Sequence, residues 1–296
     1  MAIAWVFPGQ GSQKVGMADG LLELPGARER FAQASALLER DLLAICSGSG
    51  AGELSDLNDT RNTQPALFVV ESLLVDALSA QGRRADLLAG HSLGELVALY
   101  AAGVFDADTG LALVRRRSEL MAAAGGGAMA AVMGFDRDQL ERLVAASEGV
   151  VIANDNSSAQ VVLSGLPEAV AQVSAALQCK RAVPLAVSGA FHSPFMAEAA
   201  AAFAAELEAV PFADAAVPVL SNVEPTPTTS GAALKERLRR QMTTGVRWRE
   251  TMEALAAAGV DTAVEIGPGS VLSGLFKRAG TAIGTAQIAG AADLGT

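Results

Sequence analysis

The chain has 296 residues, 51% of them hydrophobic and 18% charged, with a formal net charge of −10. This length and composition predict a globular protein with a large core and exclude a disordered chain. The negative charge opposes a broad nucleic-acid-binding surface, although residues 115–117 and 235–240 remain candidate basic patches.

Cysteine and histidine are scarce. The two cysteines are too few for a disulfide framework, and together with only two histidines they show no metal-ligand spacing. No run of about 18 uncharged apolar residues occurs, so we expect no membrane span. The apolar N-terminus also lacks the basic leader of a secretory signal. We therefore expect a monomeric, cytoplasmic protein that binds neither membrane nor nucleic acid and needs no metal or cofactor.

Strands and helices alternate over the first third of the chain. The expected strands cover residues 3–7, which lead through a glycine-rich turn into a helix, and residues 86–89. Helical periodicity covers residues 27–45, 65–80 and 94–102. Pro65 suits the start of the second of these helices, and Gly103 ends the third. This alternation predicts an α/β fold with a mainly parallel sheet.

The pattern changes at the three glycines of residues 125–127. A strand, a helix, two strands, a helix and a strand are then expected over residues 128–134, 136–146, 149–154, 160–164, 167–177 and 181–187. This βαββαβ order is the ferredoxin-like arrangement. We therefore predict a core formed by residues 1–126 and 189–296, with a ferredoxin-like subdomain inserted at residues 127–188.

Buried strands and helices return after the insertion. Residues 217–221 and 262–266 are the expected strands. Residues 280–296 are small and show no periodicity, so they predict a loose tail.

The segment Gly90-His91-Ser92-Leu93-Gly94 lies between a short apolar strand and a helix, which is the context of a nucleophile elbow. The sharp turn lifts the serine hydroxyl above the sheet edge, and the helix N-terminus favours negative charge nearby. The pattern predicts Ser92 as a catalytic nucleophile. The alternative is an ordinary strand-to-helix turn in which Ser92 caps the helix.

A serine nucleophile needs a base, and the chain offers only His91 and His192. Neighbouring side chains diverge on a tight elbow, so we expect His91 to pack or hydrogen-bond below the turn. His192 lies in a loop with Gly189 and Pro194 at a strand end, where α/β proteins place chemistry. His192 is therefore the predicted base. No carboxylate stands out as a third triad member, so a backbone or amide carbonyl could hold the histidine tautomer.

A glycine-rich segment, residues 7–13, follows the first strand. It lacks the Gly-Lys-Ser/Thr ending of a phosphate-binding loop, and Lys14 stands where the dinucleotide fingerprint needs glycine. What remains is a tight turn with exposed backbone N–H groups. Such a turn could form half of an oxyanion hole or could simply connect a strand to a helix.

Residues 108–124 predict an amphipathic helix with an arginine in an unexpected place. Four apolar residues share one face of this helix, and Arg117 lies at the centre of that face. A buried charge is costly unless it meets an anion. Arg117 therefore either pairs with an aspartate or glutamate or binds a substrate carboxylate through two parallel hydrogen bonds.

Seven short motifs follow one another along the chain. They are Gly9-Gln10-Gly11-Ser12-Gln13, Gly90-His91-Ser92-Leu93-Gly94-Glu95, Arg117, Asn154-Asp155-Asn156-Ser157, Gly189-Ala190-Phe191-His192-Ser193, Ser221-Asn222-Val223 and Glu265-Ile266-Gly267-Pro268-Gly269. Together, from about residue 3 to residue 278, they resemble the malonyl-CoA:acyl carrier protein transacylases. The resemblance implies an α/β-hydrolase-like core with a ferredoxin-like insertion, which is the order found above.

The resemblance also implies the reaction. The malonyl group of malonyl-CoA would pass to Ser92, with His192 as base, and then to the phosphopantetheine thiol of holo acyl carrier protein. Arg117 would bind the malonyl carboxylate. The remaining implied site residues are Gln10 and Leu93 for the oxyanion hole, Gln241 for its main-chain carbonyl to His192, and Phe191, Asn154 and Asn156 for substrate binding. Phe191 resembles the malonyl-selective branch, because methylmalonyl-selective relatives commonly carry a smaller residue there.

Two other protein classes share part of this pattern. A serine hydrolase would share the elbow but would not need a buried arginine, and a non-catalytic carrier-protein scaffold would need none of Ser92, His192 and Arg117. Among transacylases, a stand-alone chain suits dissociated fatty acid synthesis. A role in polyketide synthesis or malonate decarboxylation would leave similar motifs.

Overall fold

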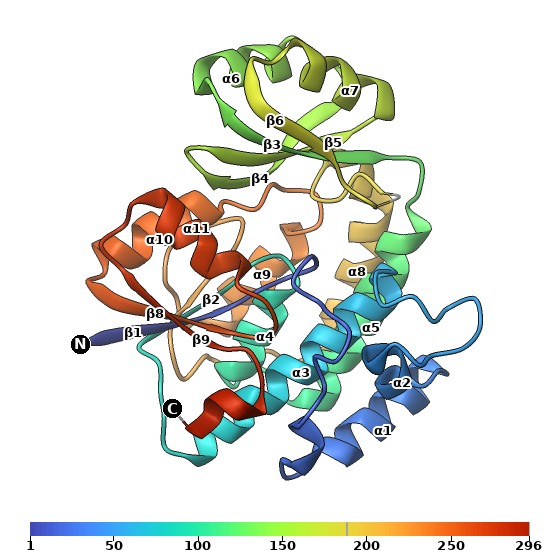
Figure 1. The fold of residues 1–296 in the computed structure, drawn as a ribbon, viewed down its shortest axis with the longest axis vertical. Helices are drawn as coiled ribbons and strands as arrows, with labels where there is room; N and C mark the ends of the chain where they lie inside the picture. Colours follow the sequence, from blue (N-terminus) through green and yellow to red (C-terminus); the bar gives the residue numbers. More distant parts are fainter. Residues whose placement is uncertain (188, 296) are drawn as a thin grey trace.

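The structure, a computed structural model, describes residues 1–187 and 189–295. It contains two separate sheets, a larger one in the core and a smaller one in a subdomain that lies above the core in Figure 1. The larger sheet is parallel, with the strand order β7-β2-β1-β8-β9. The smaller sheet is antiparallel, with the order β4-β5-β3-β6. The α/β fold with a parallel sheet and a ferredoxin-like insertion is therefore confirmed.

The larger sheet consists of β1 (Ala2–Phe7), β2 (Leu87–Gly90), β7 (Val219–Leu220), β8 (Val260–Ile266) and β9 (Gly284–Ile288). The first four of these strands are largely buried, whereas the edge strand β9 is largely exposed. Because successive strand residues point to opposite faces, Trp5 and Phe7 join one hydrophobic cluster while Ala4 and Val6 join another. Strands that are buried on both faces appear in a sequence as apolar runs, which is why the sequence revealed the first four.

Helices cover the two faces of the larger sheet. The cluster around Val6 contains Trp248 of α10 (Trp248–Ala257) and Phe276 of α11 (Val271–Ala279). The cluster around Phe7 is built by the other core helices. These are α1 (Ala27–Leu38), α2 (Leu42–Ser47), α3 (Thr60–Ala80), α4 (Gly94–Ala101), α5 (Ala107–Ala123), α8 (Ala197–Ala209) and α9 (Gly231–Arg240). Short 3₁₀ turns lie at η1 (Leu21–Glu23), η2 (Pro194–Met196) and η3 (Ala291–Gly295).

The small subdomain has the predicted βαββαβ order. Its elements are β3 (Ala128–Phe135), α6 (Arg137–Ala145), β4 (Val150–Ser157), β5 (Gln160–Gly165), α7 (Pro167–Ala176) and β6 (Cys179–Pro184). Leu140 of α6 and Val170 of α7 pack on one face of the sheet, and Met129 on the other face joins the core cluster. The chain enters and leaves this subdomain where Gly125 and Gly189 form an antiparallel bridge. The predicted boundary at residue 188 lies outside the described residues.

Helix α3 begins earlier than expected, at Thr60, and it contains Pro65 in its interior. A proline cannot donate to the carbonyl four residues before it, which here is the carbonyl of Arg61. Arg40 donates a hydrogen bond to that carbonyl at 2.8 Å, so the freed acceptor is satisfied by a distant side chain. By length and composition α3 could cross a membrane, yet 78% of its apolar window is buried inside the fold, as in a core helix.

One further expectation in the N-terminal part was wrong in detail. Residues 8–20 form turns, as the glycine-rich segment suggested, and the first α-helix begins at Ala27. The single helix expected over residues 27–45 is divided into α1 and α2, because Glu39 adopts a left-handed conformation with φ of 55° and Asp41 caps α2.

The expectation of a loose C-terminal tail was also wrong. Strand β9 pairs with β8 from Gly284 to Ile288, and the Ile288 carbonyl accepts a hydrogen bond from the Gly267 N–H. Ile283, Ile288 and Leu294 are buried. The segment is short and rich in small residues, so its sequence showed no periodicity. Its structure comes from pairing with a distant strand.

Replacing Ile288 with alanine should test whether this terminal strand contributes to stability. We expect Ile288→Ala to lower the free energy of unfolding by about 2–5 kcal/mol, because it leaves a cavity beside β8. The exposed neighbour offers a control, and Gln287→Ala should stay within about 0.5 kcal/mol of the parent. Urea titration monitored by circular dichroism measures both. Equal, small effects would mean that β9 is only loosely attached.

Candidate active site

The turn between β2 and α4 is a strand-to-helix elbow that only glycine permits at two positions. A Cβ atom on Gly90 would lie 1.9 Å from the Gly94 carbonyl, and one on Gly94 would lie 2.1 Å from the Phe7 carbonyl oxygen. Ser92, at the tip, has a φ of 52°. Left-handed backbone at a non-glycine residue is strained and occurs often at functional sites. The elbow thus exposes Ser92 at the carboxyl end of β2.

Asn222, which follows strand β7, clamps this elbow. Its side-chain oxygen accepts a hydrogen bond from the Ser92 N–H at 2.7 Å, and its amide donates to the Gly90 carbonyl at 2.5 Å. Strands β7, β2 and β1 are neighbours in the parallel sheet, so the residues after them meet at one edge. Sequence reasoning placed Asn222 in a family motif but assigned it no role.

His192 lies directly beside Ser92. Its Nε2 is 2.7 Å from the Ser92 hydroxyl, and its Nδ1 is 2.9 Å from the main-chain carbonyl of Gln241. A carbonyl only accepts hydrogen bonds, so Nδ1 carries the proton and Nε2 is left to accept one from the serine. Burial, and then the positive charge of Arg117, lower the pKa of His192 to about 3. The imidazole is therefore neutral at pH 7 and can act as a base.

His91 takes no part in this pair. Its Nε2 is 2.8 Å from the side-chain oxygen of Asn156 on β4, and its ring packs against Trp248 at 5.5 Å between centroids. Burial lowers the pKa of His91. The prediction that His91 hydrogen-bonds away from the serine therefore agrees with the geometry. Asn156 lies behind His91 and is not among the cavity-lining residues, so its substrate contact stays a prediction.

Arg117 is buried, with 1% of its surface exposed. Its guanidinium donates to the side-chain oxygens of Gln64 at 2.6 Å and Gln241 at 2.9 Å, and to the Ser92 hydroxyl at 3.1 Å. Among the described residues Nε has no partner, and no carboxylate forms a direct ion pair with this arginine. Burial lowers the pKa of Arg117 to about 10, so it stays charged at pH 7. The simple ion-pair interpretation is thus not what the structure shows.

Two polar residues to which the sequence gave no role complete this network. Gln64 links Arg117 to Thr60 at 2.8 Å, and Thr60 bonds the Gln10 side chain at 2.8 Å. Glu95, fully buried on α4, accepts a hydrogen bond from the Gln241 amide at 2.7 Å. Glu95 stands in an otherwise apolar helix, so the signal that singled out Arg117 could have found it, whereas Gln64 follows a polar first turn of α3 and carries no such signal.

Two residues with backbone N–H groups unpaired among the described residues line the same cavity as Ser92. Leu93 follows Ser92 at the start of α4, and Gln10 lies in the loop after β1. A Cβ atom on Gly9 would lie 2.4 Å from the His91 carbonyl oxygen, which shows how closely that loop approaches the elbow. Within the described part of the chain, neither the Gln10 nor the Leu93 N–H meets an acceptor. Both are free to stabilise an oxyanion.

These groups surround a cavity of about 90 Å³. Asn154 and Phe191 also line it, and the Asn154 side-chain oxygen is buried without a partner among the described residues. A wider hollow of about 1000 Å³ leads outward from it and shares Gln10, Leu185, Val187 and Phe191 with it. The site therefore combines a small inner chamber with a broad mouth. In the described residues no cluster of His, Cys, Asp or Glu could hold a metal ion.

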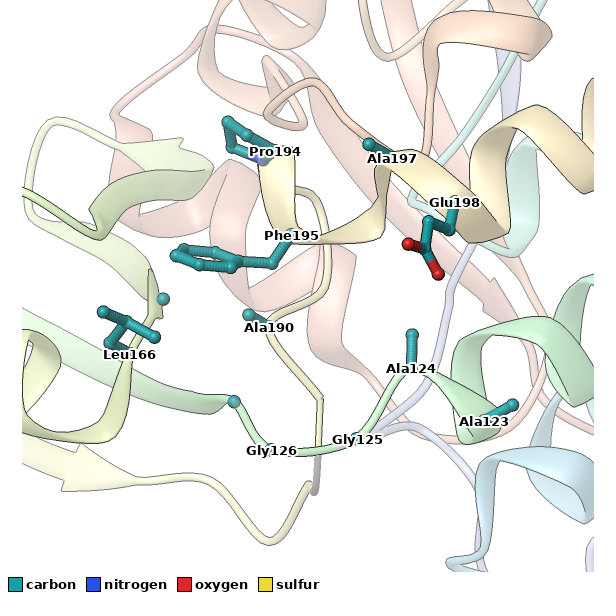
Figure 2. Close-up of a pocket in the computed structure, with 12 residues that line it drawn as sticks. Ala123, Ala124, Gly125, Gly126, Leu166, Ala190, Pro194, Phe195, Ala197 and Glu198 are labelled. Carbon is teal, nitrogen blue, oxygen red and sulfur yellow. The ribbon is translucent and has the colours of Figure 1, made fainter.

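Figure 2 shows a third hollow, of about 400 Å³, beside the link between core and subdomain. Leu166 and Phe195 line it on one side of the view, and Glu198 of α8 lines it on the other. Its lining residues include neither Ser92 nor Arg117. This hollow is therefore separate from the reactive groups.

The sequence-predicted residues thus meet around Ser92, except for Asn156. A serine hydroxyl, a neutral imidazole held by a carbonyl, free N–H groups and a buried guanidinium can support acyl transfer from an acid-bearing substrate. In the part of the chain that the structure describes, no carboxylate bonds His192, and the Gln241 main-chain carbonyl occupies the place of a triad acid.

Known proteins are similar to this chain over nearly its whole length. The sequence profile of the acyl transferase domain family matches residues 4–294. The chain is 53% identical to the malonyl CoA-acyl carrier protein transacylase of Synechocystis sp. strain PCC 6803, over 94% of each protein. A crystal structure of the Synechocystis transacylase has a TM-score of 0.95 at 51% identity, covering 100% of this chain and 99% of that one.

A malonyl-transacylase solved in complex with a type II polyketide synthase acyl carrier protein is also similar. It has a TM-score of 0.92 at 39% identity, and the match covers 99% of this chain and 98% of that one. The chain therefore belongs to the acyl transferase family and, within it, to the malonyl CoA-acyl carrier protein transacylases.

Proposed function

We propose that this protein moves the malonyl group from malonyl-CoA to the phosphopantetheine thiol of holo acyl carrier protein through a malonyl ester of Ser92. The observation that carries the proposal is the buried guanidinium of Arg117, which lies 3.1 Å from the Ser92 hydroxyl and has an unpartnered Nε. An arginine so placed suits an acyl group with its own carboxylate. The names of the relatives reported above point to the same donor and acceptor.

In the first half-reaction the Ser92 oxygen attacks the thioester carbonyl of malonyl-CoA while His192 Nε2 takes the hydroxyl proton. The short distance between these two atoms, 2.7 Å, supports this transfer. The oxyanion that forms is stabilised by the N–H groups of Gln10 and Leu93. The carbon–sulfur bond then breaks, His192 returns the proton to the sulfur, and CoA leaves the malonyl ester behind.

In the second half-reaction the steps run in reverse with a different thiol. His192 takes the proton of the phosphopantetheine thiol, the sulfur attacks the ester carbonyl, and Ser92 leaves with the proton. The Gln241 carbonyl holds the protonated Nδ1 throughout, so Nε2 always faces the reacting groups. Malonyl held by Arg117 fills the inner chamber, which leaves little room for a competing water.

The setting of the reaction follows the sequence-based expectations. We propose a cytoplasmic monomer without cofactor that serves fatty acid synthesis, with Phe191 favouring malonyl over methylmalonyl at the chamber wall. Phe191 lies between the inner chamber and the mouth, where a branched acyl group would meet it first.

Intact-mass analysis after mixing with malonyl-CoA tests the core of the proposal. The parent protein should gain one malonyl group, and Ser92→Ala should gain none because the attacking oxygen is gone. Addition of holo acyl carrier protein should remove the adduct. Continued CoA release past one equivalent without carrier protein would indicate a hydrolase, and an adduct that persists in Ser92→Ala would rule out this nucleophile.

Arg117→Ala should separate the donors by their charge. We expect it to weaken malonyl transfer by about 2–4 kcal/mol in kcat/KM, since charged hydrogen bonds to the carboxylate are lost. Acetyl transfer, which has no carboxylate to bind, should fall much less. Steady-state kinetics with malonyl-CoA and acetyl-CoA measure both, and an equal loss for the two donors would refute a carboxylate-binding role.

The pH dependence of Ser92 acylation reports on His192. Neutral His192 is the active form, and its pKa is lowered to about 3 from an ordinary value of about 6.5. The rate of adduct formation should therefore hold as the pH falls from 7 to about 5, whereas an ordinary histidine would lose most of its base form. Below about pH 6.5 His192 binds a proton in the unfolded state but stays neutral in the folded state. The free energy of unfolding should therefore decrease as the pH falls. Rapid-quench mass analysis measures the rate, and an acid limb near pH 6.5 would contradict the shift.

A further inference from the structure

Glu95, the residue that ends the elbow motif, is a buried acid that the proposed reaction does not use. Its side chain is fully buried. One carboxyl oxygen accepts hydrogen bonds from the Gln241 amide at 2.7 Å and from the Asn222 N–H at 3.1 Å, and the other has no partner among the described residues. On balance the pKa of Glu95 is raised, because burial outweighs the hydrogen-bond donors and the charge of Arg117, which lower it. Every contact therefore favours the ionised form against the cost of burial.

The side-chain amide of Gln241 lies between Glu95 and Arg117. Its oxygen accepts from the Arg117 guanidinium at 2.9 Å, and its nitrogen donates to Glu95 at 2.7 Å and to the Ser92 carbonyl at 2.9 Å. A guanidinium only donates and a carboxylate only accepts, so a flipped amide would lose the bonds on both sides. The two charges thus fix the orientation of the amide.

The charges themselves balance inside the protein. A single buried charge is costly, and a buried charge whose partner is removed is strongly destabilising. Among the described residues no acid forms a direct ion pair with Arg117, and Glu95 is the charged group that raises its pKa against the effect of burial. Glu95 is therefore the group that balances Arg117 when no substrate is present.

We propose that Glu95 is the resident counter-charge of Arg117, connected to it through the Gln241 side chain, and that it sets how strongly Arg117 attracts the substrate carboxylate. Glu95 does not line the chamber, so it acts as a positioning residue through its two neighbours. Because Glu95 already balances the charge of Arg117, the malonyl carboxylate binds Arg117 less tightly than it would bind an unbalanced arginine. The malonyl group can therefore leave the site more easily when it passes to the carrier thiol. This inference rests on the proposed function and adds the control of malonyl affinity to it.

Glu95 is also connected to the catalytic histidine, His192, through Gln241. Gln241 contributes its main-chain carbonyl to His192 and its side chain to Glu95. A single residue thus connects the base that activates Ser92 with the charge pair that selects the acyl group. Glu95 holds this residue from the side opposite to Arg117.

Glu95→Gln keeps the size of the side chain and an acceptor oxygen but removes the charge. Arg117 then lacks a counter-charge, so the KM for malonyl-CoA should fall and the ratio of kcat/KM for malonyl over acetyl transfer should rise by about tenfold. If Glu95 had only a structural role, kcat/KM should fall equally for both donors and their ratio should stay the same. Glu71→Gln removes another buried acid, one whose pKa is raised by burial and by Glu265 rather than lowered by Arg117, and should leave the ratio unchanged. An unchanged or lower ratio in Glu95→Gln would overturn the proposal.

Stability provides a second, independent readout. Arg117→Ala leaves the buried charge of Glu95 without a compensating charge. Adding Glu95→Gln removes that charge, so the double variant should have a higher melting temperature than Arg117→Ala. If Glu95→Gln alone fails to fold because Arg117 is left unbalanced, the double variant should still fold. A double variant that is no more stable than Arg117→Ala would refute the counter-charge. The malonyl adduct at Ser92 of the parent protein tests the proposed reaction separately, so the two ideas can fail independently.

Discussion

The burial of one positive charge beneath the nucleophile is the constraint on which this site depends. Burying the Arg117 guanidinium is costly unless its N–H groups have hydrogen-bond acceptors in the protein or in a ligand. Its partners come from three distant parts of the chain, Gln64 on α3, Ser92 at the elbow and Gln241 after α9. These hydrogen bonds connect the three segments around Ser92. The guanidinium thus organises the polar network around Ser92.

The parallel sheet and the small subdomain supply the frame for this arrangement. Adjacent strands deliver Gln10, Ser92 and Asn222 to one edge of the larger sheet, because the carboxyl ends of parallel strands lie together. The subdomain is tied to the same edge, since Asn156 of β4 bonds His91 beside the nucleophile. Asp155 of the same strand also holds an arginine of α10 at 3.0 Å. The chamber is therefore lined by residues of both the core and the subdomain.

Local sequence signals predicted most elements and failed where a remote contact decided the outcome. Pro65 suggested a helix start, but the Arg40 side chain, from the link between α1 and α2, bonds the carbonyl that Pro65 leaves free inside α3. Residues 284–288 carried no periodicity, and pairing with β8 makes them a strand. Arg117 stood out because a charge on an apolar face is rare, whereas Gln64 and Glu95 passed unnoticed since uncharged or singly placed polar groups are common. In each case the missing information was a partner far away in the chain.

The sequence by itself determined the chemistry available to this protein. Its glycine spacing specifies an elbow, its two histidines leave a single base, and its misplaced arginine specifies a buried cation. Only the tertiary structure decided how these parts work together. It placed the Gln241 carbonyl 2.9 Å from His192 and the Gln241 amide between Arg117 and Glu95. Hydrogen bonds and charge pairs act over a few ångströms, and only folding brings residues more than a hundred positions apart within that range.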